Sequence, residues 1–170
     1  NMKLKKIPVC MIGAGRIGFK LEFDKKRVKP ASHFGMWIMN KRFSLKAIAD
    51  KKYVELKYKK KISKNISFFK NFEKMINEKK PKIVSISTWK DTHYKITQKC
   101  IDLGIKVIIL EKPLANNLEQ AKKLIKNIKK NKVKVLVNHR RRYDDDIIRL
   151  KKKNKSRTHR RNITNFIFLC

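Results

Sequence analysis

Acidic residues are scarce in this chain of 170 residues. Asp and Glu together number 13, against 47 Lys and Arg, and the net charge is +34. A field of this sign attracts nucleic acids and other polyanions by counterion release. The basic residues are spread along the whole sequence, however, and no zinc-finger spacing or aromatic RNA-binding signature accompanies them. The sequence therefore predicts no specific nucleic-acid partner and only weak, salt-sensitive binding.

Cysteine is also scarce, and its spacing excludes the usual cysteine-based sites. Cys10, Cys100 and Cys170 form no C-x-x-C pair and no metal-ligand spacing. We therefore predict no metal site. Cys10 lies in an apolar strand pattern and Cys100 in a helical pattern, so we expect both to be buried free thiols.

Long apolar runs are missing. No stretch reaches the roughly 18 apolar residues that a membrane helix needs. The short apolar run near the N-terminus ends in glycines and is interrupted by Arg16, which favours a first strand over a signal peptide. We predict no membrane association and a cytoplasmic protein. Its length and its hydrophobic fraction of 41% fit about one globular domain.

Short apolar runs alternate with longer helical patterns along the chain. We expect strands at 7–13, 44–50, 65–69, 82–88, 105–111 and 133–138, and helices at 16–23, 34–40, 72–80, 91–104, 117–130 and from about 139 to 150. This alternation predicts an α/β fold with a doubly wound, mostly parallel sheet of the Rossmann type.

Three local expectations accompany this pattern. Asp91 is the expected N-cap of its helix and Gly104 the expected stop. The segment 24–43 is longer than a βαβ unit requires, and both a surface excursion and a substrate-contacting loop remain open. The helix at 117–130 is predicted to bury one stripe made of Leu118, Ala121, Leu124, Ile125 and Ile128.

A glycine pattern, G-x-G-x-x-G, stands between the first expected strand and helix. Gly13 permits a tight turn, Gly15 lets the backbone approach a pyrophosphate, and Gly18 allows close packing of helix on strand. The N-terminus of the following helix would offer N–H groups to the phosphates. Arg16 and Ile17 complete the predicted cofactor-binding loop, and Arg16 would add a positive charge.

Asp50 ends the second expected strand. A carboxylate there accepts hydrogen bonds from the adenosine ribose and repels a 2′-phosphate, which favours NAD over NADP. Lys51 and Lys52 follow directly and leave NADP open, since either could pair with that phosphate. A turn residue without a ligand is the plainer alternative for Asp50.

Several segments in order resemble the Gfo/Idh/MocA family of oxidoreductases (glucose–fructose oxidoreductase, inositol dehydrogenase and relatives). The resemblance covers residue 7 to about residue 152. "LEFDKKRVKPASHFG" (21–35) is similar to the long first loop of members associated with surface-sugar synthesis. The other matching segments are "GAGRIG" (13–18), "STWKDTHY" (87–94), "ILEKPLANNLEQAKKL" (109–124) and "NHRRRYDDDI" (138–147).

The resemblance implies an NAD(P)-dependent enzyme that oxidises or reduces a sugar-like secondary alcohol. It makes Lys112, the lysine of E-K-P, the catalytic proton carrier, a task that suits an amine. Glu111 would hold the cofactor or orient the site. The resemblance implies further cofactor contacts by Thr88, Trp89, His93, Lys112 and Asn138, and substrate contacts by His33 and Arg142.

Family members continue well beyond this length. We therefore expect a cofactor domain at 1–150, followed at 151–170 by a basic tail and at most the first strand of a second α+β domain, as in a truncated chain. A homo-oligomer is possible, although the domain that usually forms the interface would be missing. Three functions remain open: a sugar-type oxidoreductase with impaired turnover, a dinucleotide-binding module that acts with a partner, and a basic nucleic-acid-binding protein.

Overall fold

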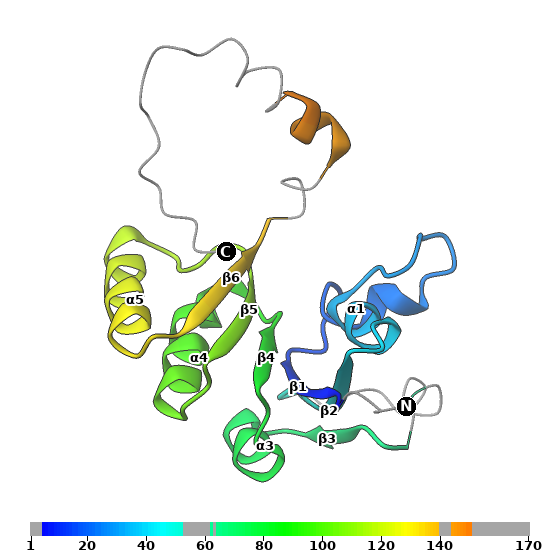
Figure 1. Ribbon diagram of the computed structural model, residues 1–170, viewed down its shortest axis with the longest axis horizontal. Coiled ribbons are helices and arrows are strands. Elements are labelled where there is room, and N and C mark those ends of the chain that lie inside the picture. The colour runs from blue at the N-terminus through cyan, green and yellow to red at the C-terminus, as the bar shows by residue number, and fades with distance from the viewer. Residues whose placement is uncertain (1–4, 53–61, 63, 140–143, 151–170) are drawn as a thin grey trace.

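A six-stranded parallel sheet organises the chain (Figure 1). The structure is a computed structural model and describes residues 5–52, 62, 64–139 and 144–150. The strand order is β3-β2-β1-β4-β5-β6, the doubly wound order, so the predicted fold class is confirmed. The strands are β1 (Ile7–Ile12), β2 (Phe43–Ala49), β3 (Ser67–Phe69), β4 (Ile83–Ile86), β5 (Val107–Glu111) and β6 (Lys134–Asn138).

Helices cover both faces of the sheet. Residues from α3, α4 and α5 pack with one set of strand side chains, whereas α1 packs with the opposite set. Figure 1 shows α1 well separated from α4 and α5. Residues 145–150 are also helical. The helices are α1 (His33–Met39), α3 (Phe72–Lys79), α4 (Lys90–Asp102), α5 (Leu118–Lys130) and a short 3-10 helix, η1 (Lys20–Phe23).

The segment 24–43 supplies part of the core. Phe34 and Trp37 of α1 are each 3% exposed and pack with Phe19 against the β1–β2 face of the sheet. The rings of Phe19 and Phe34 meet edge to face, with their centroids 4.8 Å apart. A surface excursion, one of the two alternatives for this segment, therefore does not describe its helical part.

The predicted helix at 16–23 is wrong. Its place is taken by turns and by η1, because α1 occupies the carbonyl groups that a helix would use. The carbonyl oxygen of Ile17 accepts from the backbone N–H of His33 at 3.2 Å, and that of Gly18 accepts from Phe34 at 2.9 Å. In an α-helix these two carbonyls would instead bond the N–H groups four residues on.

Two further local predictions need correction. Trp89 occupies the N-cap position of α4, and Asp91 lies in the first turn, where its carboxylate accepts from Asn116. On α5, Leu124 and Ile128 are buried as predicted. Leu118 is 69% exposed and Ile125 is 42% exposed, so the buried stripe is narrower than its periodicity indicates.

Some expectations fall outside the described residues. The predicted tail at 151–170, with Cys170, and the predicted substrate contact Arg142 lie there. Within the described part of the chain, no helix has the length and apolar character to cross a membrane.

Burial of the two described thiols gives a test of this packing. Cys10 and Cys100 are both buried, and burial raises the pKa of each thiol to about 12. Since the thiolate is the nucleophile, iodoacetamide at about pH 8 should modify them more than about a hundredfold more slowly in the native chain than in urea. Mass spectrometry of timed samples measures both rates. Rapid modification of either thiol in the native chain would contradict the packing around β1 and α4.

Candidate functional site

The candidate site lies at the carboxyl ends of β1 and β4, where the strand order reverses direction. Ligands of open α/β sheets bind at this point. The loop after β1 is tied to the neighbouring strand ends: the N–H of Gly13 donates to Ala49 at 2.8 Å, and the N–H of Ser87 donates to Ile12 at 2.8 Å. The hydroxyl of Ser87 also donates to the Gly13 carbonyl at 3.0 Å.

Two glycines of the loop are required by contacts within the protein. Gly13 has φ +97°, and a Cβ there would lie 2.8 Å from the carbonyl carbon of Ser87. A Cβ on Gly18 would lie 2.5 Å from the Gly13 carbonyl oxygen and would also clash with the Ser87 hydroxyl. These two positions exclude a side chain whether or not a ligand is present.

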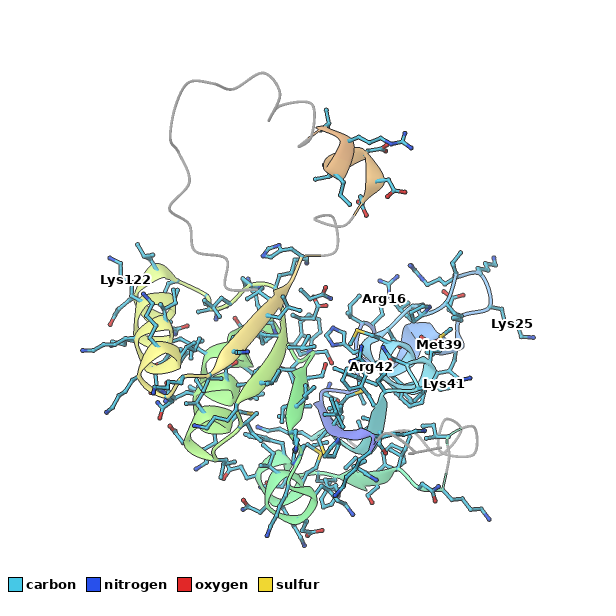
Figure 2. The ribbon with its side chains drawn as sticks, in the orientation of Figure 1. Arg16, Lys25, Met39, Lys41, Arg42 and Lys122 are labelled. Carbon is cyan, nitrogen blue, oxygen red and sulfur yellow. The ribbon has the colours of Figure 1, made fainter. Side chains whose placement is uncertain are left out.

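Gly15 differs from its two neighbours in the motif. A Cβ there would meet no atom within 4 Å, so the fold itself does not exclude a side chain. Gly15, Arg16 and Ile17 are exposed, and their backbone N–H groups have no acceptor among the described residues. Figure 2 shows Arg16 on the side of the molecule that holds α1, above Lys41 and Arg42. The middle of the loop thus presents N–H groups and one cation to open space.

Asp50 follows β2 and lies against this loop. Its Oδ2 accepts from the N–H of Ala14 at 2.7 Å, and its Oδ1 accepts from the N–H of Lys52 at 2.8 Å. Each carboxylate oxygen has two lone pairs, so both retain capacity for a further donor. The carboxylate therefore stands beside the exposed N–H groups of the loop, one strand away.

The residues after β4 divide into one exposed and one buried group. Trp89 is 82% exposed at the start of α4, beside Thr88. His93 is only 1% exposed, and its ring bridges two segments: Nδ1 lies 2.6 Å from the Pro113 carbonyl oxygen and Nε2 lies 3.1 Å from that of Thr88. The described contacts of His93 are thus structural, and its predicted cofactor contact stays a prediction.

Glu111 is the last residue of β5, and its carboxylate has three hydrogen-bond partners. Its Oε1 accepts from Asn138 Nδ2 at 2.6 Å and lies 2.9 Å from His33 Nε2. Burial alone would raise the pKa of Glu111, but the hydrogen bonds from His33 and Asn138 and the backbone N–H of Lys112 outweigh it, and the pKa is lowered. Glu111 is therefore a carboxylate near neutral pH.

Lys112 follows Glu111 and is exposed at the same edge of the sheet. Its peptide bond to Pro113 is cis. Among the described residues, no carboxylate lies within ion-pairing distance of the Lys112 ammonium. An exposed, unpaired amine at the carboxyl end of β5 can exchange a proton with a bound ligand.

The fold places most of the predicted site residues at one edge of the sheet. These residues end or follow β1, β2, β4, β5 and β6 at their carboxyl ends: the loop glycines, Asp50, Thr88, Trp89, Glu111, Lys112 and Asn138. His33 is different, because it is buried and both ring nitrogens have protein partners. Its direct substrate contact stays a prediction that these contacts do not favour.

Two serines of the site were not predicted. Ser85 is fully buried and bonds His33, and Ser87 carries the contact with the glycine loop. The signal in the sequence was a pair of hydroxyl residues inside the apolar strand "KIVSIST". Buried polar groups need hydrogen-bond partners, so their presence in a buried strand indicates a specific polar contact.

The chain is similar to known proteins. Residues 7–139 match the model of an oxidoreductase family with an NAD-binding Rossmann fold, Gfo/Idh/MocA. A curated relative, scyllo-inositol 2-dehydrogenase (NADP(+)) IolW of Bacillus subtilis, is 31% identical over 80 residues. That alignment covers 47% of this chain and 22% of the relative.

Solved structures share the fold. The WlbA dehydrogenase of Chromobacterium violaceum, in complex with NADH and UDP-GlcNAcA, superposes with a TM-score of 0.73 at 19% identity. The WlbA dehydrogenase of Bordetella pertussis, with the same two ligands, gives 0.72 at 20%. The matches cover 92% and 89% of this chain but only 41% and 42% of those chains.

The chain therefore spans about two fifths of the length of these structures and carries the part that forms the parallel sheet. The family match extends over most of the described residues and includes the glycine loop, Asp50 and Lys112. This chain belongs to the Gfo/Idh/MocA oxidoreductase family, whose members have an NAD-binding Rossmann fold.

Proposed function

We propose that this chain carries the cofactor half of an NAD(P)-dependent oxidoreductase that acts on a secondary alcohol of a sugar, a nucleotide sugar or a polyol. One observation carries the proposal: Gly15 is the loop position at which the fold leaves room for a side chain and the sequence supplies none. A ligand that must approach the backbone explains this glycine. The exposed N–H groups of the loop and the neighbouring Asp50 fit a diphosphate joined to a ribose.

The proposed roles follow from the chemistry of each group. The N–H groups at Gly15, Arg16 and Ile17 bind the diphosphate, and Arg16 adds a charge. Asp50 accepts hydrogen bonds from the adenosine ribose. A nicotinamide bound there would supply the hydride chemistry at the alcohol carbon. Lys112 Nζ takes up the hydroxyl proton in one direction and donates it in the other.

The substrate class rests on relatives that the chain covers only in part. An inositol dehydrogenase and dehydrogenases crystallised with UDP-GlcNAcA both point to a polyhydroxylated substrate. A dinucleotide-binding module that needs a separate partner is the second candidate. It is favoured by the exposure of Lys112 and Trp89 at the edge where the substrate would bind, since no other part of the described chain covers them.

Replacing Gly15 tests whether the glycine loop binds the diphosphate. Gly15→Val should weaken NADH binding more than about twentyfold, because the branched side chain displaces a diphosphate held by several charge-assisted hydrogen bonds. Its stability to urea should stay within about 0.5 kcal/mol of the wild type, since the site is open. NADH fluorescence in about 0.15 M salt measures binding.

Gly104→Ala is the matched control for Gly15→Val. Gly104 also has open space around it but adopts φ +82°, far from the loop. Alanine there should cost about 1 kcal/mol of stability and leave NADH binding unchanged. If the wild type and Gly15→Val bound NADH equally, weakly and in a salt-sensitive way, diphosphate binding by the glycine loop would be contradicted. The basic nucleic-acid-binding alternative would then be favoured.

Replacing Lys112 tests the chemical step. With NAD and a panel of polyols and nucleotide sugars, Lys112→Ala should lower turnover by about 10²- to 10⁴-fold, since it removes the proton acceptor. NADH binding should change little. Lys106→Ala, which removes an exposed lysine at the opposite, amino end of β5, is the control. Unchanged turnover in Lys112→Ala would refute the role of Lys112. NADH binding without any turnover in the wild type would support the second candidate, a dinucleotide-binding module that needs a partner.

Cofactor preference tests Asp50. Asp50→Asn keeps an acceptor for the Ala14 N–H but removes the charge that repels a 2′-phosphate. The ratio of NADPH to NADH affinity should rise about tenfold, helped by Lys51 and Lys52. Fluorescence titration with each reduced cofactor measures the ratio. An unchanged ratio would show that the Asp50 charge does not discriminate between the two.

A further inference from the structure

His33 links the long first segment of the chain to the residue before Lys112. Its ring lies between two side chains: Nδ1 is 2.6 Å from the Ser85 hydroxyl and Nε2 is 2.9 Å from the Glu111 carboxylate. Asn138 donates to the same carboxylate oxygen at 2.6 Å. Four elements, α1, β4, β5 and β6, thus meet in one chain of hydrogen bonds directly beside Lys112.

The direction of the hydrogen bond between His33 and Glu111 can be assigned. The pKa of Glu111 is lowered by His33 and Asn138 against the opposing effect of burial, so the group is ionised and only accepts. Nε2 of His33 must therefore carry the proton that lies between the ring and Glu111. The Ser85 hydroxyl lies 2.6 Å from Nδ1 and can donate to this nitrogen or accept from it.

The position of the Glu111 charge matters because Lys112 is the next residue. A Glu111 carboxylate without the donors His33 and Asn138 is available to the neighbouring ammonium. An ion pair stabilises the protonated form of the lysine, whereas only the neutral amine accepts a proton. In the structure the Glu111 side chain is 14% exposed and is held by His33 and Asn138. No carboxylate of the described residues pairs with Lys112.

We propose that His33 is a positioning residue: its Nε2–H, together with Asn138, holds the Glu111 carboxylate away from the ammonium of Lys112 and so keeps the amine available for proton transfer. The inference rests on the proposed function, which makes Lys112 the group that transfers the proton. His33 itself is 5% exposed, with both nitrogens bonded, so it acts through Glu111 without touching cofactor or substrate.

Competitive acylation of the lysines tests the proposal without requiring turnover. The chain is treated with trace acetic anhydride near neutral pH, and mass spectrometry gives the labelling of Lys112 relative to Lys106 in the same molecule. His33→Leu removes the donor, so Glu111 should pair with Lys112 and the ratio should fall about three- to fivefold, the range of an exposed ion pair. His33→Gln keeps an N–H donor and should stay within about twofold of the wild type.

Asn138→Leu provides a second route to the same effect, since it removes the other side-chain donor to the same Glu111 oxygen. It should lower the ratio as well, even if His33→Leu fails to fold. An unchanged ratio in folded His33→Leu and Asn138→Leu would overturn the proposal, as would equal losses in His33→Gln and His33→Leu. Turnover that survives Lys112→Ala would refute the proposed function alone, because the labelling ratio is independent of it.

Discussion

The site depends on how closely the loop after β1 approaches the end of β4. A Cβ at Gly13 or Gly18 would overlap the backbone or side chain of Ser87, or the loop itself. This contact includes the hydrogen bond from the Ser87 hydroxyl to the Gly13 carbonyl, and it leaves the middle of the loop facing outward. The exposed N–H groups at Gly15 and its neighbours, and the contact between Asp50 and Ala14, follow from that orientation. One steric constraint within the protein thus prepares the surface that a diphosphate would occupy.

A second consequence concerns α1. The first N–H groups of α1 use the carbonyls of Ile17 and Gly18, so the helix is attached directly to the glycine loop. This attachment places His33 within reach of Ser85 and Glu111, at the far end of the site. The loop proposed to bind the cofactor and the turn that carries Lys112 are therefore connected through one short helix. The segment 24–43, too long for a simple crossover, is what makes this connection possible.

The sequence predicted the strands, their mostly parallel, doubly wound arrangement and the place of Asp50 at the end of the second strand, because these depend on local apolar patterns and on the sense of βαβ crossovers. It did not predict the loss of the helix at 16–23. That outcome depends on the backbone N–H groups of residues 33 and 34, which donate to carbonyl groups of residues 17 and 18. Local helix propensity does not encode such a contact. The His33–Glu111 hydrogen bond joins residues 78 positions apart, so local sequence patterns could not predict it either. The exposure of Leu118 and Ile125 shows that periodicity indicates a face but not how much of it is covered.

The central claim is that the outward N–H groups of the glycine loop bind the cofactor diphosphate. An NADH titration of the ¹⁵N-labelled chain, followed by amide chemical shifts, tests it most directly. The account predicts that the amides of Gly15, Arg16 and Ile17 shift most and saturate together, while the amide of Gly104 stays in place. Shifts spread over the lysine-rich surfaces of α4 and α5 that disappear with added salt, with the loop amides unmoved, would contradict it.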